Sequence, residues 1–263
     1  MKQYNDDELL SLKYNQIEIL ERDDNKEVYL GERKKDNKKV VIKQINLLSF
    51  DEELKKKAKE EAKILSNLEH PNIIKYYDCI FEKNKEIIIM EYVEGGNLKE
   101  KIEEKKVIEE NKIIDWFIEI CEGRKYIHKN KIIHRNLKSN NIFLTKDNHI
   151  KIGDYGISNI LYNESQSKTN IETAFYLSPE IIKGKSYDYK SDIWNLGIIL
   201  YELTQLKYPF IYSYFVNKNY SEQLLNLIKN ILRVNPNERL NIDEIIDECN
   251  ILKIKNNSKS KRE

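Results

Sequence analysis

The sequence predicts an α+β fold of two lobes, in which a strand-rich first third precedes a helical remainder. Residues 14–46 include the consecutive β-branched residues Val40, Val41 and Ile42, a run that is typical of strands. From residue 109 onward, apolar residues recur at the three-to-four spacing of helices. Neither an internal repeat nor a linker rich in proline, glycine and serine divides the chain.

The first third has a helix between its strands. In residues 51–67, apolar and alanine residues repeat every three to four positions among lysines and glutamates, which predicts an amphipathic helix. A His-Pro-Asn segment at residues 70–72 ends this helix. Two more strands are expected at residues 73–81 and 87–93, before a loop at residues 94–97.

The remainder of the chain is expected to be helical. Residues 109–130 carry one apolar face, and Arg124 falls on that same face. We interpret Arg124 either as an edge residue whose guanidinium reaches water or as a sign of a loosened core. Further helices are predicted at residues 188–205, 221–232 and 241–249. The tail from Lys253 is rich in lysine, asparagine and serine and is expected to be disordered.

The composition excludes several classes of partner and compartment. The 45 basic and 44 acidic residues balance, so nucleic acid and membrane surfaces are not expected as partners. Three widely spaced cysteines predict neither disulfides nor a metal site and favour a reducing compartment. Residues 1–16 lack the apolar core of a secretory signal, and the apolar run at residues 193–203 is too short to span a bilayer. We expect a soluble protein of the cytoplasm or nucleus.

Three short segments carry the chemistry. Val40–Lys43 is an apolar strand that ends in lysine, residues 134–141 read His-Arg-Asn-Leu-Lys-Ser-Asn-Asn, and residues 154–156 read Asp-Tyr-Gly. In this order and spacing they resemble the lysine strand, catalytic loop and metal-binding triplet of eukaryotic protein kinases. The resemblance implies a bilobal kinase fold, with a small β-rich N-lobe at about residues 14–93 and a larger α-helical C-lobe at about residues 94–250.

Other segments extend the resemblance over roughly residues 14–250. Ser178-Pro179-Glu180 is similar to the end of the family's activation segment, and Arg239 stands where the family places the partner of Glu180. The Tyr-Leu-Ser-Pro-Glu segment that ends at Glu180 looks most like the NIMA-related serine/threonine kinases. Residues 1–13 would then be an N-terminal extension, and residues 251–263 a disordered basic tail.

The resemblance implies roles for individual residues. Lys43, held by Glu61, would place its charge on the phosphates of ATP, and Asn141 and Asp154 would offer oxygen ligands to Mg²⁺. The nucleotide pocket would further include Val28, Val41, Met90, Glu91, Val93 and Phe143. Lys138 would reach the transferred phosphoryl group. Structural or regulatory roles would fall to His134, Arg135, Thr173, Glu180, Asp192 and Arg239.

The position of the catalytic base departs from the family pattern. Asn136 stands where the family carries an aspartate that accepts the proton of the substrate hydroxyl. A carboxamide has no basic lone pair at neutral pH. General-base assistance is worth roughly 10²–10⁴-fold, whereas positioning and Mg²⁺ supply much of the remaining catalysis. We therefore expect phosphotransfer activity to be absent or very weak.

The phosphate loop also departs from the pattern. When the sequence is aligned on Val28, Glu21, Asp23 and Lys26 stand at the positions of the three family glycines. Glycines let the backbone approach phosphate closely, and each carboxylate here would cost about 1 kcal/mol beside a polyanion. We expect binding of ATP and Mg²⁺ to be weak.

Three interpretations of function remain open. In the first, the chain is an inactive serine/threonine kinase, a pseudokinase, that acts as a regulatory module by binding other proteins. In the second, it is an active or weakly active serine/threonine kinase that transfers the γ-phosphate of ATP to protein, with Asn136 only orienting the substrate. In the third, it is a decayed, truncated kinase without function. The sequence specifies neither the partner nor the oligomeric state.

Overall fold

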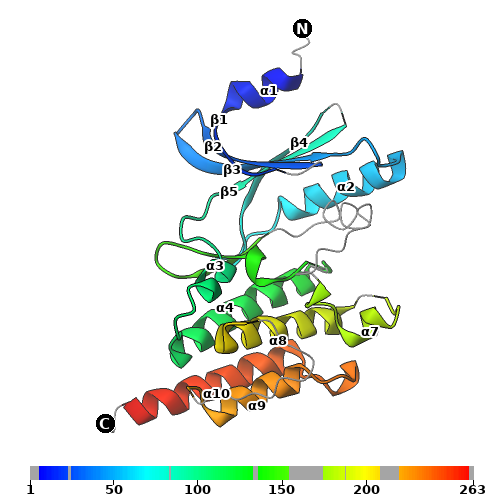
Figure 1. Ribbon diagram of the computed structural model, residues 1–263. Helices are drawn as coiled ribbons and strands as arrows, with labels where there is room; N and C mark the ends of the chain where they lie inside the picture. The colour runs from blue at the N-terminus through cyan, green and yellow to red at the C-terminus, as the bar shows by residue number, and fades with distance from the viewer. Residues whose placement is uncertain are drawn as a thin grey trace. The chain divides into compact units, whose positions relative to one another are not determined.

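The computed structural model describes residues 6–22, 25–82, 84–132, 136–153, 174–186, 188–207 and 219–260. Among these residues the chain forms two compact units, the first ending at Val93 and the second beginning at Glu94. The first unit is built on a five-stranded sheet and the second is mainly helical (Figure 1). The predicted α+β class is confirmed.

The sheet of the first unit is antiparallel throughout. Its strands are β1 (Tyr14–Arg22), β2 (Lys26–Arg33), β3 (Lys38–Asn46), β4 (Tyr76–Glu82) and β5 (Lys85–Glu91), in the order β1-β2-β3-β5-β4. The strand expected from residue 73 begins only at Tyr76, because the backbone N–H of Ile73 turns back to the carbonyl of His70 (3.2 Å).

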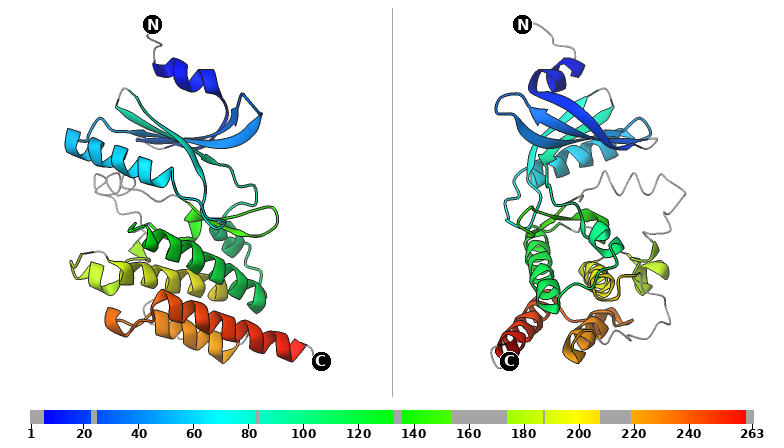
Figure 2. Two further views of the ribbon diagram at one scale, coloured as in Figure 1. Left: turned by 180° about the vertical axis from the view of Figure 1, so that it is seen from behind. Right: turned by 60° about the vertical axis from the view of Figure 1, so that its left-hand side comes forward.

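Helices cover both faces of this sheet (Figures 1 and 2). Helix α1 (Asp6–Lys13) contributes Leu10 to a buried cluster with Val40, Ile42, Ile87 and Ile89. This helix lies within the segment that the sequence assigns only to a polar extension. Antiparallel pairing places Val40, Ile42, Ile87 and Ile89 on one face, so that face is the α1 side of the sheet.

Helix α2 (Glu52–Leu65) lies on the opposite face and agrees with the helix predicted at residues 51–67. Asp51 caps its N-terminus by accepting a hydrogen bond from the backbone N–H of Leu54 (2.8 Å). Ala58, Ala62 and Leu65 are buried, as the three-to-four spacing predicts.

The second unit is a stack of helices with a short hairpin. The helices are α3 (Leu98–Glu103), α4 (Glu110–Lys129), α7 (Pro179–Ile182), α8 (Tyr189–Gln205), α9 (Glu222–Ile231) and α10 (Ile242–Ser260). Strands β6 (Ile142–Leu144) and β7 (Ile150–Ile152) form the hairpin, and single 3₁₀ turns lie at Ser139–Asn141 and Pro236–Glu238. No helix in the described part of the chain is long and apolar enough to cross a bilayer.

Helix α8 lies in the core of this unit, beside α4 and α9 (Figure 2). Gly197 allows the close approach of α8 to α9, since a Cβ atom there would lie 2.6 Å from a methyl carbon of Leu232. Helix α10 packs along α4 and α9. The helical face predicted in residues 109–130 is confirmed, with Ile113, Phe117, Ile120 and Ile127 fully buried.

The last helix differs from the prediction. The sequence predicts a helix that ends at residue 249 and a disordered tail from residue 251, but α10 continues to Ser260. Leu252 is buried, Lys253 forms an ion pair with Asp115 (2.6 Å), and the amide of Asn256 donates to Glu110 (3.1 Å). These contacts with α4 order the extra turns. The composition of the tail predicted disorder because composition carries no information about such contacts.

Arg124 is neither an edge residue nor a sign of a loosened core. Its side chain is completely buried in α4 and forms an ion pair with Asp192 of α8, which is also fully buried. His128, one turn further along α4, lies 3.3 Å from the same Asp192 carboxylate. The guanidinium is therefore part of a charged contact between two core helices.

Candidate functional site

In the first unit, the predicted nucleotide-binding residues share one face of the sheet. Antiparallel partners point to the same side, so the pairs Val28↔Lys43 and Val41↔Met90 place these four side chains together. This face is opposite the α1 side. Lys43 is only 4% exposed. A lysine held at the centre of a sheet face that also carries apolar side chains fits a site for an apolar ring attached to phosphates.

The β1–β2 hairpin is held by exposed ion pairs. The Nζ atom of Lys26 lies 2.6 Å from the carboxylate of Glu21, and the Nε atom of Arg22 lies 2.7 Å from the carboxylate of Glu27. Glu21 and Lys26 occupy two of the positions at which the family has glycine. Lys26 and Arg22 therefore offset part of the negative charge in this hairpin. The side chains of Glu21 and Lys26 are nevertheless present at positions where family members have glycine.

The end of β5 is anchored to the segment before β4. The backbone N–H of Glu91 donates to the carbonyl of Lys75 (2.8 Å), and the Glu91 carboxylate accepts from the backbone N–H of Lys75 (3.1 Å). Met90 is buried and Val93 is half-buried. This double contact holds the chain that leads out of the first unit, where the adenine-binding residues are predicted.

In the second unit, the loop from residue 136 to residue 141 is tightly bonded. The side-chain amide of Asn141 donates to the backbone carbonyl of Asn136 (2.8 Å), and the backbone N–H of Asn141 donates to the carbonyl of Lys138 (2.9 Å). The carbonyl of Asn141 accepts in turn from the N–H of Gly153 at the end of β7 (2.9 Å). Phe143 follows in β6 and is half-buried.

This arrangement suits a magnesium ligand at Asn141. Because the amide nitrogen is committed to Asn136, the Oδ1 atom is the part of the side chain that can face a cation, and Mg²⁺ prefers oxygen ligands. The predicted second ligand, Asp154, follows Gly153 directly in the sequence but lies outside the described residues. Within the described residues, no group of three His, Cys, Asp or Glu residues forms an alternative metal site.

A buried tyrosine links the loop to α8. The hydroxyl of Tyr176 donates to the carboxylate of Glu202 and accepts from the backbone N–H of Ser139 (3.1 Å). The side-chain amide of Asn195 donates to the Tyr176 carbonyl (2.9 Å). Burial, followed by the nearby Glu202 charge, raises the pKa of Tyr176 well above its usual value. Tyr176 therefore stays protonated and joins three segments of the second unit.

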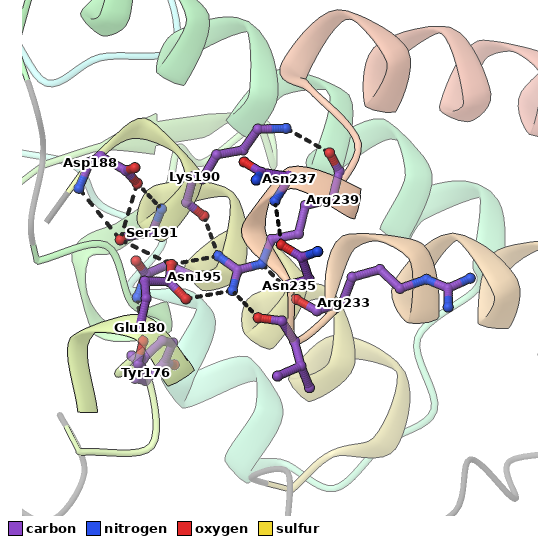
Figure 3. Close-up of polar contacts among 11 residues, drawn as sticks. Tyr176, Glu180, Asp188, Lys190, Ser191, Asn195, Arg233, Asn235, Asn237 and Arg239 are labelled. Atoms are coloured by element: carbon purple, nitrogen blue, oxygen red, sulfur yellow. Dashed lines mark hydrogen bonds and ion pairs between the residues drawn. The ribbon is translucent and has the colours of Figure 1, made fainter. Parts of the chain in front are cut away.

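Glu180 and Arg239 form the ion pair that the resemblance implies (Figure 3). Two guanidinium nitrogens of Arg239 donate to the two carboxylate oxygens of Glu180 at 2.7 and 2.6 Å. Arg239 also donates to the carbonyls of Arg233, Lys190 and Val234, and its guanidinium lies 5.0 Å from the centre of the Trp194 ring. The fork is thus fully used, which a lysine in its place would not achieve.

The environment of Glu180 keeps it charged. Burial alone raises the pKa of Glu180, but hydrogen bonds from Arg239 and other donors outweigh burial and bring the pKa to about 2. The hydroxyl of Ser191 adds a hydrogen bond to the same carboxylate (3.2 Å). Ser191 also belongs to the capping box of α8 with Asp188, so the ion pair is joined to the start of that helix.

Several of the predicted site residues fall outside the described part of the chain. His134, Arg135, Asp154 and Thr173 lie outside the described residues, as does Asp23 of the phosphate loop. Glu61 lies in α2, but its side chain is not among those described, so the pair of Lys43 with Glu61 stays a prediction.

The sequence matches the protein kinase domain family over residues 14–249. The chain belongs to the protein kinase family. Mouse serine/threonine-protein kinase Nek1 (Mus musculus) is 38% identical over 235 residues, which cover 83% of this chain and 20% of that protein. Human serine/threonine-protein kinase Nek5 (Homo sapiens) is 36% identical over 252 residues, which cover 89% of this chain and 36% of that protein.

A third relative extends the same picture. The probable serine/threonine-protein kinase nek3 of Dictyostelium discoideum is 37% identical over 258 residues, which cover 89% of this chain and 23% of that protein. The predicted likeness to NIMA-related kinases is confirmed by these relatives. This kinase chain spans about a fifth to a third of the length of the curated relatives named here.

Sequence reasoning missed three buried contacts of this kinase chain. Asn195 and Glu202 interrupt the apolar run at residues 193–203, and both bind Tyr176. Arg124 was noted on an apolar face without its partner Asp192. The signal that finds such contacts is a polar residue at a core position, because such a residue requires a buried partner.

Proposed function

We propose that this protein kinase domain is an inactive or nearly inactive member of its family that acts by binding other proteins. The observation that carries the proposal is the asparagine at position 136, in a loop that is held by hydrogen bonds between Asn141 and Asn136 and between Gly153 and Asn141. The loop around the site is formed, but the side chain that would accept the proton of the substrate hydroxyl carries a carboxamide in place of a carboxylate. General-base loss alone removes roughly 10²–10⁴-fold of rate.

The phosphate-binding hairpin supports the same proposal. Glu21 and Lys26 pair with each other where the family has glycines, so side chains occupy the space in which backbone N–H groups approach phosphate. ATP and Mg²⁺, which protein kinases use, are therefore proposed to bind weakly. Lys43 and Asn141 remain to hold the phosphates and the metal ion, respectively.

The charged interior supports a folded module rather than a decayed one. A buried charge without a partner is costly, and among the described residues Arg239 with Glu180 and Arg124 with Asp192 form buried ion pairs. The cysteines support the intracellular location that we propose. All three are free thiols, and structural disulfides are rare in reducing intracellular compartments.

The second candidate is a weakly active serine/threonine kinase. The bonded Asn136–Asn141 loop and the buried Lys43 favour it, since positioning and Mg²⁺ provide much of phosphoryl-transfer catalysis. In this alternative Asn136 would accept a hydrogen bond from the substrate hydroxyl and orient it, while the proton leaves to solvent.

Phosphate transfer from radiolabelled ATP to a generic protein substrate separates the two candidates. The proposal predicts no signal above that of an Asp154→Asn control, and a thermal shift of under about 1 °C with millimolar ATP·Mg²⁺. Robust transfer that depends on Asp154, at an ordinary kinase rate, contradicts the proposal. The melting curve also reports folding, since a decayed product would lack a cooperative transition.

A further inference from the structure

A large pocket lies in the first unit, on the α1 side of the sheet, away from the Lys43 face. Its volume is about 870 Å³, and it is bounded by the end of α1 and by all five strands. We call it the α1 pocket and define it by its lining residues Leu10, Ser11, Tyr14, Asn15, Gln16, Glu27, Tyr29, Lys34, Gln44, Glu82, Lys85 and Ile87. This volume is that of a ligand site rather than of a packing defect.

One lining residue, Glu82, is a buried acid without a hydrogen-bond partner in the described part of the chain. Glu82, at the end of β4, is only 5% exposed, and neither of its carboxylate oxygens has a hydrogen-bond partner among the described residues. Pairing with Lys85 across the hairpin places Glu82 on the α1 side of the sheet, where it lines the pocket. A buried carboxylate without a partner is costly, so a group that approaches it with hydrogen-bond donors and positive charge gains a strong contact.

The other charged groups of the α1 pocket already have partners. The Glu27 carboxylate accepts from the Tyr29 hydroxyl (2.8 Å) and pairs with Arg22. Lys34 donates to the Ser11 carbonyl (2.5 Å), and Lys85 donates to the Gln44 amide oxygen (3.3 Å). Within the described residues, Glu82 is therefore the charged group of the pocket that lacks a partner, and a cation would supply one.

We propose that the α1 pocket docks a protein partner by taking an arginine or lysine side chain, whose cationic head binds Glu82. Leu10, Tyr14 and Ile87 lie beside the polar groups and suit the apolar stem of that side chain and its neighbours. The pocket is larger than one side chain, so a short segment of the partner enters with it. The inference that the ligand is a protein rests on the proposed function, whereas the inference that it carries a positive charge rests on Glu82 alone.

Binding of peptide pools tests this docking site. The probes are two fluorescein-labelled nonapeptide pools with degenerate flanks, one with arginine fixed at the centre and one with citrulline, which keeps the shape without the charge. Saturable binding of the arginine pool is expected, with roughly ten- to hundred-fold weaker binding of the citrulline pool or of the Glu82→Gln variant. Equal binding of the two pools, no binding of either, or an unchanged affinity of Glu82→Gln overturns the proposal.

Two controls keep the result independent of folding. Glu86→Gln removes another buried carboxylate of the same hairpin, one that lies on the opposite face beside Cys79, and it should leave the affinity for the arginine pool unchanged. Because Glu82 has no internal partner, Glu82→Gln should melt at or above the wild-type temperature. A lower melting temperature would show a structural role for Glu82 and overturn the proposal. The assay contains no nucleotide, so its outcome is separate from that of the transfer assay.

Discussion

Arg124 of α4 forms an ion pair with Asp192 of α8, and both side chains are fully buried. His128 lies beside the same carboxylate. Breaking a buried pair from one side leaves an uncompensated charge, and this costs about 3–5 kcal/mol of the free energy of unfolding. We therefore expect Arg124→Leu to lower stability by about that amount in urea titrations.

A matched control for Arg124→Leu is Lys125→Ala. Lys125 is the next residue of α4, and its ion pair with Asp243 is exposed, so its loss should leave the urea midpoint almost unchanged. The double variant Arg124→Leu with Asp192→Asn should be more stable than Arg124→Leu alone, because the stranded charge is gone. Equal stability of the double and single variants would argue that the two side chains do not interact.

Glu180 gives the domain a dependence on acid. Its pKa falls from an ordinary value of 4.5 to about 2 on folding, so the unfolded chain binds the proton more readily. The stabilisation is fully present above pH 4.5 and is lost as the pH falls toward 2. After allowance for solvent screening we expect a loss of about 2 kcal/mol between pH 5 and pH 2. Urea titrations of wild type and Glu180→Gln across this range measure it, and parallel pH profiles of the two proteins would refute it.

The buried hydroxyl of Tyr176 is expected to stabilise the domain. Removal of its hydroxyl in Tyr176→Phe leaves Glu202 without that donor and Ser139 without that acceptor, at a cost of about 1–3 kcal/mol. Adding Glu202→Gln, which removes the charge, should recover part of the loss. Chemical denaturation monitored by tryptophan fluorescence measures both variants. A neutral Tyr176→Phe would show that the hydroxyl contributes nothing to stability.

The α8–α9 contact predicts an overpacking effect. A methyl group at position 197 would lie 2.6 Å from the side chain of Leu232, so Gly197→Ala should destabilise the domain by about 1–3 kcal/mol, although alanine is the better helix former. The double variant Gly197→Ala with Leu232→Ala, which clears the space, should regain part of that stability. An increase in stability for Gly197→Ala alone would show that α9 moves freely to accommodate the methyl group.

Periodicity predicted the helices and strands well where one face is apolar. The helix at residues 51–67 was found as α2, and the helix at residues 109–130 as α4, with errors of one or two residues at the ends. These elements were predictable because burial of a regular stripe is a local property of the sequence. The order of the kinase motifs also predicted the ion pair of Glu180 with Arg239.

What failed depends on partners distant in sequence. The last turns of α10 are held by Asp115 and Glu110, about 140 residues away, so their composition alone suggested disorder. Arg124 needed Asp192, and the pocket carboxylate Glu82 needed the whole sheet to bury it. A polar residue at an apolar position signals that a partner exists, but it does not identify the partner.

Single-turnover phosphate transfer tests the central claim most directly. The proteins compared are wild type, Asn136→Asp, and Asn136→Asp combined with glycines at positions 21, 23 and 26, each with and without Asp154→Asn. We predict no Asp154-dependent transfer by wild type, little or none by Asn136→Asp alone, and measurable transfer only when both defects are repaired. Asp154-dependent transfer by the wild-type protein at an ordinary kinase rate, about 1–100 s⁻¹, would contradict the account.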